Sequence, residues 1–105
     1  MKSRNGDQVL GGPPSVPQWT FLTNHAQVLL CVARDPDARL REIGDAVGIT
    51  ERATHRIVGE LADAGYLTRE RVGRRNKYEV HSHLRLHDSL AREQKVGDLL
   101  RVLAE

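Results

Sequence analysis

Hydrophobic residues along the chain recur first at helical spacing, then at alternate positions, and then at helical spacing again. The first helix is predicted to begin at Thr23 or Asn24, either of which is a good N-cap residue. It is predicted to end near Arg34, because the sequence from Asp35 to Asp37 favours a turn. The apolar side of this helix is formed by Ala26, Leu29, Leu30 and Ala33.

A short extended segment, Ala38–Leu40, is expected after this turn and is a candidate third strand beside a later hairpin. A second helix follows over residues 41–47. Gly44 lies within it, where a missing side chain permits another helix to approach closely. The apolar side of this second helix is formed by Leu40, Ile43, Ala46 and Val47.

The segment from Gly48 to Leu67 predicts a tight turn, a capped helix and the start of a strand. Gly48 can take the positive φ of a sharp turn, Thr50 suits the N-cap, and Gly65 suits the residue after the helix. Two helices joined in this way form a helix-turn-helix. One side of the second of these helices carries Ala53, Ile57, Leu61 and Ala64, flanked by Thr54 and Val58, and the other carries Arg52, His55, Arg56 and Gly59.

Two extended segments, residues 66–72 and 77–80, predict a β-hairpin after Gly65. Residues 73–76 join them, with Gly73 and Asn76 as turn residues. The hairpin is strongly basic, with one interleaved acid, Glu70. Its basic residues are Arg69, Arg71, Arg74, Arg75 and Lys77.

The C-terminal quarter predicts a polar connection and one amphipathic helix. In residues 81–94 the apolar anchors are Leu84, Leu86 and Leu90. The final helix has its apolar stripe on one side, which must pack on the first helix or on its copy in a second subunit. This stripe is formed by Val96, Leu99, Leu100 and Leu103.

Composition limits what the chain can do. Its 105 residues suit one small domain, and the formal net charge of +2 is mild, so the clustered basic residues carry the argument for nucleic-acid binding.

We expect a disordered tail over residues 1–17, a winged helix-turn-helix domain over 18–80 and an extension over 81–105. The fold class is mainly α with a small β-hairpin. Trp19 and Phe21 either cover one end of the core or form a dimer contact.

The order of elements and several motifs resemble the DNA-binding part of MarR-like and ArsR-like prokaryotic transcription regulators. The motifs are Leu40–Thr50, Arg56–Val58 with Leu61, Ala64–Leu67, the arginine-rich hairpin and Tyr78. The resemblance implies a homodimer on a pseudo-palindromic operator. It also implies that the helix of residues 50–64 enters the major groove and that the hairpin, residues 69–77, reaches phosphates or the minor groove. The implied DNA-binding residues are Thr50, Arg52, His55, Arg56, Arg69, Arg71, Arg74, Arg75, Asn76 and Lys77.

Alternatives remain open for these basic residues. Arg52 or Arg56 can donate two hydrogen bonds to guanine, or can pair with Glu51 or Glu60 on the same helix. The hairpin can be a solvated surface without a ligand. A second hypothesis for function is a winged-helix module that uses the hairpin to bind an acidic protein partner.

Other chemistries have little support in the sequence. The single cysteine, Cys31, lies in an apolar run and is interpreted as a buried thiol, with redox sensing as the alternative. His81, His83 and His87 have partial metal-ligand spacing without a thiolate, so no metal or cofactor is expected. No phosphate loop or nucleophile elbow is present, which argues against an enzyme. No apolar run is long enough to cross a membrane, and the predicted location is the cytoplasm.

Overall fold

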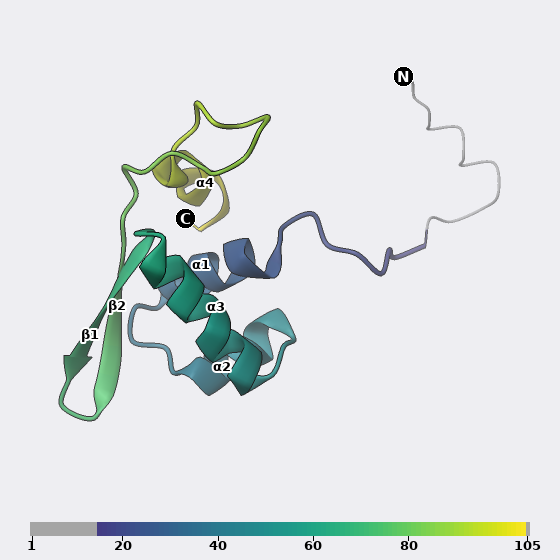
Figure 1. Ribbon diagram of the computed structural model, residues 1–105. Coiled ribbons are helices and arrows are strands. Elements are labelled where there is room, and N and C mark those ends of the chain that lie inside the picture. The colour runs from purple at the N-terminus through teal and green to yellow at the C-terminus, as the bar shows by residue number, and fades with distance from the viewer. Residues whose placement is uncertain (1–14, 105) are drawn as a thin grey trace, which may run out of the picture.

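The structure is a computed structural model that describes residues 15–104, and these form four helices and one two-stranded antiparallel sheet. Three helices pack beside the hairpin, and the fourth lies across α1 (Figure 1). This is the predicted winged helix-turn-helix architecture with an additional C-terminal helix. In chain order the elements are α1 (Asn24–Arg34), α2 (Leu40–Val47), α3 (Glu51–Asp63), β1 (Leu67–Val72), β2 (Arg75–Val80) and α4 (Val96–Leu103).

Helix α1 begins at Asn24 because the hydroxyl of Thr23 accepts a hydrogen bond from the Ala26 N–H at 3.1 Å. Of the two predicted N-caps, Thr23 is therefore the one used. The helix ends at Arg34, as predicted. Its buried side chains, which face α2 and α3, are Val28, Leu29 and Val32.

Helices α2 and α3 approach closely at Gly44, as the sequence predicted. A Cβ on Gly44 would lie 2.8 Å from the Thr54 Oγ1 atom and 2.9 Å from the Ile49 carbonyl oxygen. Thr54 is fully buried at this contact. Glycine therefore sets how closely the two helices of the helix-turn-helix can pack.

The turn between these helices also follows the sequence. Gly48 has φ of +90°, a left-handed conformation that favours glycine. The Thr50 hydroxyl then accepts a hydrogen bond from the Ala53 N–H at 3.0 Å and caps α3. The turn and the cap together fix where α3 begins.

Helix α3 ends in a Schellman motif that leads directly into the hairpin. Gly65 has φ of +87°, the Tyr66 N–H donates to the Leu61 carbonyl at 2.9 Å, and the Gly65 N–H donates to the Ala62 carbonyl at 3.0 Å. Strand β1 begins two residues later, at Leu67. The tight exit holds the base of the hairpin next to the end of α3.

The hairpin turn is shorter than predicted. The strands pair from Leu67 opposite Val80 to Val72 opposite Arg75, which leaves Gly73 and Arg74 as the turn. Asn76 is therefore not a turn residue: it lies in β2, opposite Arg71. The positive φ of Gly73, +64°, supplies the tight reversal, and Asn76 is not needed for it.

The core is aliphatic and lies between the three helices and the base of the hairpin. Val28, Ile43, Ile57 and Val58 are at most 1% exposed. Tyr78 of β2 joins the same cluster at 4% exposure. Packing of α1 against β2 and of α3 against β1 fixes the position of the hairpin relative to the helices.

The connection after β2 folds back to bring α4 onto α1. The Val96 N–H donates to the Leu84 carbonyl at 2.8 Å, and the Gly97 N–H donates to the Ser82 carbonyl at 2.9 Å. Val96 is fully buried, and an Arg34 guanidinium nitrogen donates to the Leu103 carbonyl. Of the two predicted partners for the last helix, the structure therefore shows α1 of the same chain.

The candidate third strand at Ala38–Leu40 does not form in the part of the chain that the structure describes. Leu40 is already the first residue of α2, and the sheet has two strands. The Arg39 N–H donates to the Glu42 carboxylate at 2.8 Å, which starts the helix there. At the edge of β2, the Tyr78 N–H donates a backbone hydrogen bond to the Pro36 carbonyl at 2.9 Å.

Two expectations about apolar contacts are also wrong. Ala64 is exposed, because the buried side of α3 is rotated toward Thr54 and Val58. Leu90 is 96% exposed and does not anchor its segment. Of the two alternatives left open for Trp19 and Phe21, these side chains do not cover the core, since they are 61% and 92% exposed. The predicted tail lies mostly outside the described residues, and residues 15–17 have no regular secondary structure.

Candidate nucleic-acid interface

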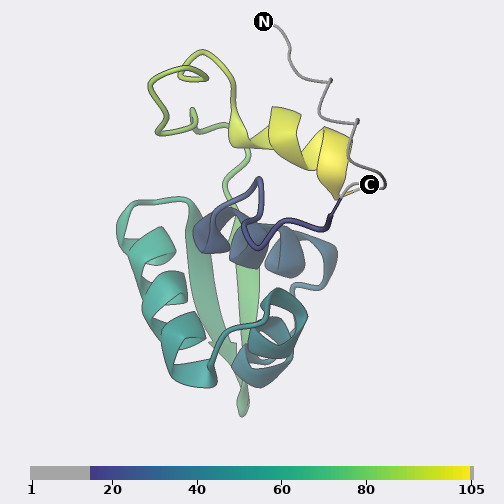
Figure 2. The same cartoon turned by 90° about the vertical axis from the view of Figure 1, so that its right-hand side faces the viewer.

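The start of α2, the start of α3 and the hairpin tip lie at one end of the molecule, with α4 at the other (Figure 2). A cleft of about 510 Å³ separates the helix starts from the hairpin. Both predicted DNA-contacting elements therefore face the same direction. The cleft is lined by Asp37, Ala38, Arg39, Leu40, Arg41, Glu51, Arg74, Arg75, Asn76 and Tyr78.

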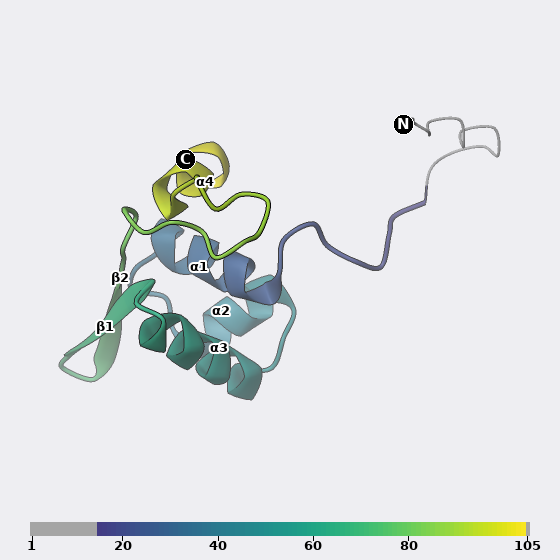
Figure 3. The same ribbon diagram turned by 45° about the horizontal axis from the view of Figure 1, so that its top comes forward.

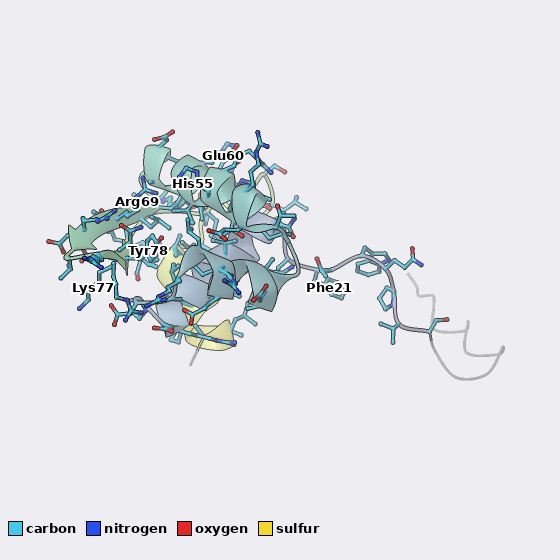
Figure 4. The ribbon with its side chains drawn as sticks, turned by 90° about the horizontal axis from the view of Figure 1, so that it is seen from below. Phe21, His55, Glu60, Arg69, Lys77 and Tyr78 are labelled. Carbon is cyan, nitrogen blue, oxygen red and sulfur yellow. The ribbon has the colours of Figure 1, made fainter. Side chains whose placement is uncertain are left out.

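The outer face of α3 carries exposed polar side chains, as predicted. Arg52, His55 and Arg56 are all exposed, and the side of the helix behind them is buried. Figure 4 looks at the molecule from this end and shows His55 and Glu60 on α3 and Arg69 on the hairpin. The arrangement leaves the first two turns of α3 free to enter a groove.

Thr50 has a structural role that limits what its side chain can offer. Its hydroxyl oxygen accepts the capping hydrogen bond of α3 and its carbonyl accepts from the Thr54 hydroxyl at 2.9 Å. The hydroxyl proton remains available to a phosphate oxygen at the start of the helix.

Arg56 is paired within its own helix, one of the two alternatives that the sequence left open. Its Nη1 donates to both carboxylate oxygens of Glu60, at 3.3 and 3.2 Å. The same carboxylate lies 2.6 Å from Nε2 of His25 on α1. The hydrogen bond with His25, followed by the contacts with Arg56, lowers the pKa of Glu60 below its ordinary value, so this carboxylate is ionised at neutral pH.

The strand register separates the hairpin's basic residues by face. Paired residues share a face, so Arg69, opposite Tyr78, and Arg71, opposite Asn76, lie on the side that faces the helices. Lys77 lies on the other face, opposite Glu70. The basic residues of the hairpin are therefore divided between its two faces, with the arginines of β1 on the side of the helices and Lys77 on the other side.

Hydrogen bonds fix two of the hairpin arginines. The Arg75 guanidinium donates to the Asp37 carbonyl at 3.0 Å and ties the hairpin to the loop before α2. The Arg71 Nε donates to the Gly73 carbonyl at 3.2 Å. Both side chains stay exposed, with donors left for a phosphate.

Two further basic residues, Arg39 and Arg41, were not predicted from the sequence. Both are exposed and line the cleft opposite Arg74. The signal that predicts them is their position on either side of Leu40, at the start of the first helix of the helix-turn-helix. Backbone N–H groups at a helix start add to the attraction for phosphate.

The histidine segment after β2 does not gather into a metal site. In residues 15–104 no three potential ligands from His, Cys, Asp and Glu come together. His81 Nε2 instead lies 2.5 Å from the Thr68 hydroxyl, and its ring packs edge-on against His83.

Cys31 is half-buried rather than fully buried, and burial raises the pKa of its thiol. Across the described ranges, no helix combines the length and apolarity needed to span a bilayer.

Comparison with known proteins identifies the family to which the chain belongs. A MarR family model matches residues 20–75, more than half of the chain. The chain belongs to the MarR family. Proteins of this family are transcriptional regulators rather than enzymes, in agreement with the sequence analysis. A search of curated proteins found no match.

A solved structure shares the MarR family fold. The crystal structure of the PcaV transcriptional regulator from Streptomyces coelicolor, in complex with its natural ligand, matches with a TM-score of 0.51 at 21% sequence identity. The match covers 79% of this chain and 63% of PcaV, so the chain spans less than two thirds of PcaV's length. At this identity the likeness establishes the fold, a winged helix-turn-helix.

Proposed function

We propose that this MarR family protein is a transcription regulator that binds double-stranded DNA in a sequence-dependent way. The observation that carries the proposal is the shared direction of the first turns of α3 and of the hairpin tip (Figure 2). Helix α3 would enter the major groove while the hairpin follows the adjacent backbone. Such a regulator would act in the cytoplasm, where prokaryotic DNA is.

The side chains divide into two groups by what they would contact. Arg52, His55 and Arg56 stand on the face of α3 that would meet base edges, and an arginine can donate two hydrogen bonds to guanine. The remaining residues would hold phosphates and so position α3 in the groove. These are Thr50, Arg39, Arg41, Arg69, Arg71, Arg74, Arg75, Asn76 and Lys77.

A homodimer is the second part of the proposal, supported by where large apolar side chains are exposed. Val16, Trp19, Phe21, Leu90 and Val102 are each at least 61% exposed, and all lie in the segments before α1 or after β2. Figure 3 shows the segment before α1 extending away from the helices. Exposed aromatic and aliphatic side chains of this kind are typical of interface residues. A dimer formed through these segments would leave both hairpins free for two half-sites.

The deciding experiment selects bound duplexes from a random DNA library with the full chain, and determines the mass of the complex. A preferred, two-fold symmetric sequence with half-sites about one helical turn apart is the expected result. Binding that is weak and independent of sequence would contradict it and favour the protein-interaction module predicted as the alternative. A preferred sequence bound by one chain alone would retain DNA recognition and reject the dimer.

A further inference from the structure

Glu60 links α1 to the outer face of α3 through two hydrogen-bonded side chains. His25 of α1 reaches it from 35 residues away, with 2.6 Å between Nε2 and Oε1. Arg56 reaches it from the preceding turn of α3. A helix behind the proposed DNA-binding face thus shares one carboxylate with a side chain on that face.

Arg56 is held by one nitrogen only. Both of its contacts with Glu60 use Nη1, at 3.3 and 3.2 Å. Within residues 15–104, neither its Nε nor its Nη2 has a hydrogen-bond partner, and the side chain is 61% exposed. The guanidinium is therefore oriented at one corner while donors remain for a base edge.

The contact with His25 restricts what Glu60 can do. A carboxylate without this contact can take Arg56 by two parallel hydrogen bonds, the geometry that arginine and carboxylate favour. The 2.6 Å contact is made at Oε1, the oxygen that Arg56 Nη1 also meets at 3.3 Å, and it holds the carboxylate toward α1. Arg56 is then left with longer contacts through one nitrogen, which DNA can replace at low cost.

We propose that His25 is a positioning residue for DNA recognition, because it fixes Glu60 and thereby orients the Arg56 guanidinium. The inference rests on the proposed function, since it assumes that Arg56 meets a base. His25 itself lies on α1 and would contact no base.

The test compares His25→Leu, which removes the ring nitrogen, with His25→Gln, whose amide can replace it as a partner for Glu60. Relative affinities for the four bases are measured at the position that Arg56→Ala identifies. We expect His25→Leu to lower base preference there about fivefold, with His25→Gln close to the parent. His87→Leu is the matched control, because His87 is an exposed histidine lining the same small cavity as His25. It should leave the preference unchanged.

The double variant His25→Leu with Arg56→Ala should lose no more preference than Arg56→Ala alone. Independent, additive losses of base preference in the double variant would overturn the inference. An equal loss of affinity for every sequence in His25→Leu, with a changed salt dependence, would also overturn it, because His25 would then be a phosphate contact. If His25→Leu left the base preference unchanged while Arg56→Ala lowered it, the inference would be overturned and the proposed function would stand.

A measurement without DNA keeps the inference testable if Arg56 reads no base. NMR relaxation of the Arg56 Nε–Hε group in the free protein reports how firmly the guanidinium is held. His25→Leu should change its mobility and His25→Gln should restore the parent value. Equal mobility in all three proteins would overturn the inference whatever the DNA measurements show.

Discussion

The Thr54 hydroxyl lies 2.8 Å from the point where a Cβ on Gly44 would stand, which places the two helices of the helix-turn-helix in direct contact. Thr54 is fully buried there, and its hydroxyl donates to the Thr50 carbonyl at 2.9 Å. The side chain that packs against α2 therefore also secures the residue that caps α3. The angle at which α3 presents its outer face depends on this contact.

Gly44→Ala should destabilise the fold by about 1–3 kcal/mol, because the added methyl group overpacks the contact with Thr54. Gly59→Ala is the matched control. Its Cβ would meet nothing within 4 Å, so it should stabilise α3 by about 0.5–1 kcal/mol. Urea unfolding measures both free energies of unfolding. Equal effects of the two substitutions would show that Gly44 is not at a tight contact.

Arg75→Ala should weaken binding to all DNA sequences alike and reduce the slope of log affinity against log salt by about one, because one phosphate contact is lost. Arg75 also holds the hairpin to the Asp37 carbonyl, so a second variant is needed. Arg74→Ala removes a charge at the hairpin tip without that bond and should reduce the slope similarly. Salt slopes equal to the parent's in both variants would reject the proposed hairpin contact.

Arg56→Ala should relax preference at one base position, at a cost of about 1–3 kcal/mol in binding free energy for the preferred sequence. The measurement is competition between duplexes that differ at single positions. Thermal unfolding of the free variant is the control, since the exposed pair with Glu60 contributes little to stability. A lower melting temperature with preference intact would make Arg56 structural.

Trp19→Ala combined with Phe21→Ala should shift the protein from dimer toward monomer. The two rings pack edge-on with centroids 5.1 Å apart, and Figure 4 shows Phe21 on the segment that extends from the body. Aromatic side chains at an interface often carry much of its binding energy. Sedimentation equilibrium over a range of concentrations measures the change. Leu90→Ala tests whether another exposed apolar residue has a comparable effect, and an unchanged mass in all variants would reject these contacts.

Asp98→Asn should lower stability at neutral pH and lose this effect in acid. The Lys95 backbone N–H, followed by Arg101, lowers the pKa of the Asp98 carboxyl below its ordinary value. A lowered pKa in the folded state means that the ionised group stabilises the fold above the unfolded-state pKa, and that the gain disappears as pH falls through the folded pKa. The difference in unfolding free energy between parent and variant should therefore be constant above about pH 5 and shrink below about pH 4. A difference that persists unchanged in acid would contradict stabilisation by the ionised Asp98 carboxylate.

Much of the fold follows from local sequence signals. Thr50, Gly48 and Gly65 each satisfy a backbone requirement of their own turn or cap, so they predict the bounds of α3 without knowledge of distant contacts. The spacing of the apolar residues predicts α1 and α4 in the same way. The predictions of a buried Ala64 and of a third strand were wrong because burial and strand pairing depend on which segments meet in space. Local propensity does not specify this.

Local sequence signals are enough to predict a capped helix followed by a basic hairpin, because caps, glycine turns and alternating patterns act over a few residues. The face that each basic residue occupies depends instead on the three-dimensional fold. Strand register turned Arg69 and Arg71 toward α3 and Lys77 away from it. Packing of α1 against α3 brought His25 to Glu60, a contact across 35 residues that no local pattern specifies. The fold also places Arg39 and Arg41, at the start of α2, in the cleft beside the hairpin.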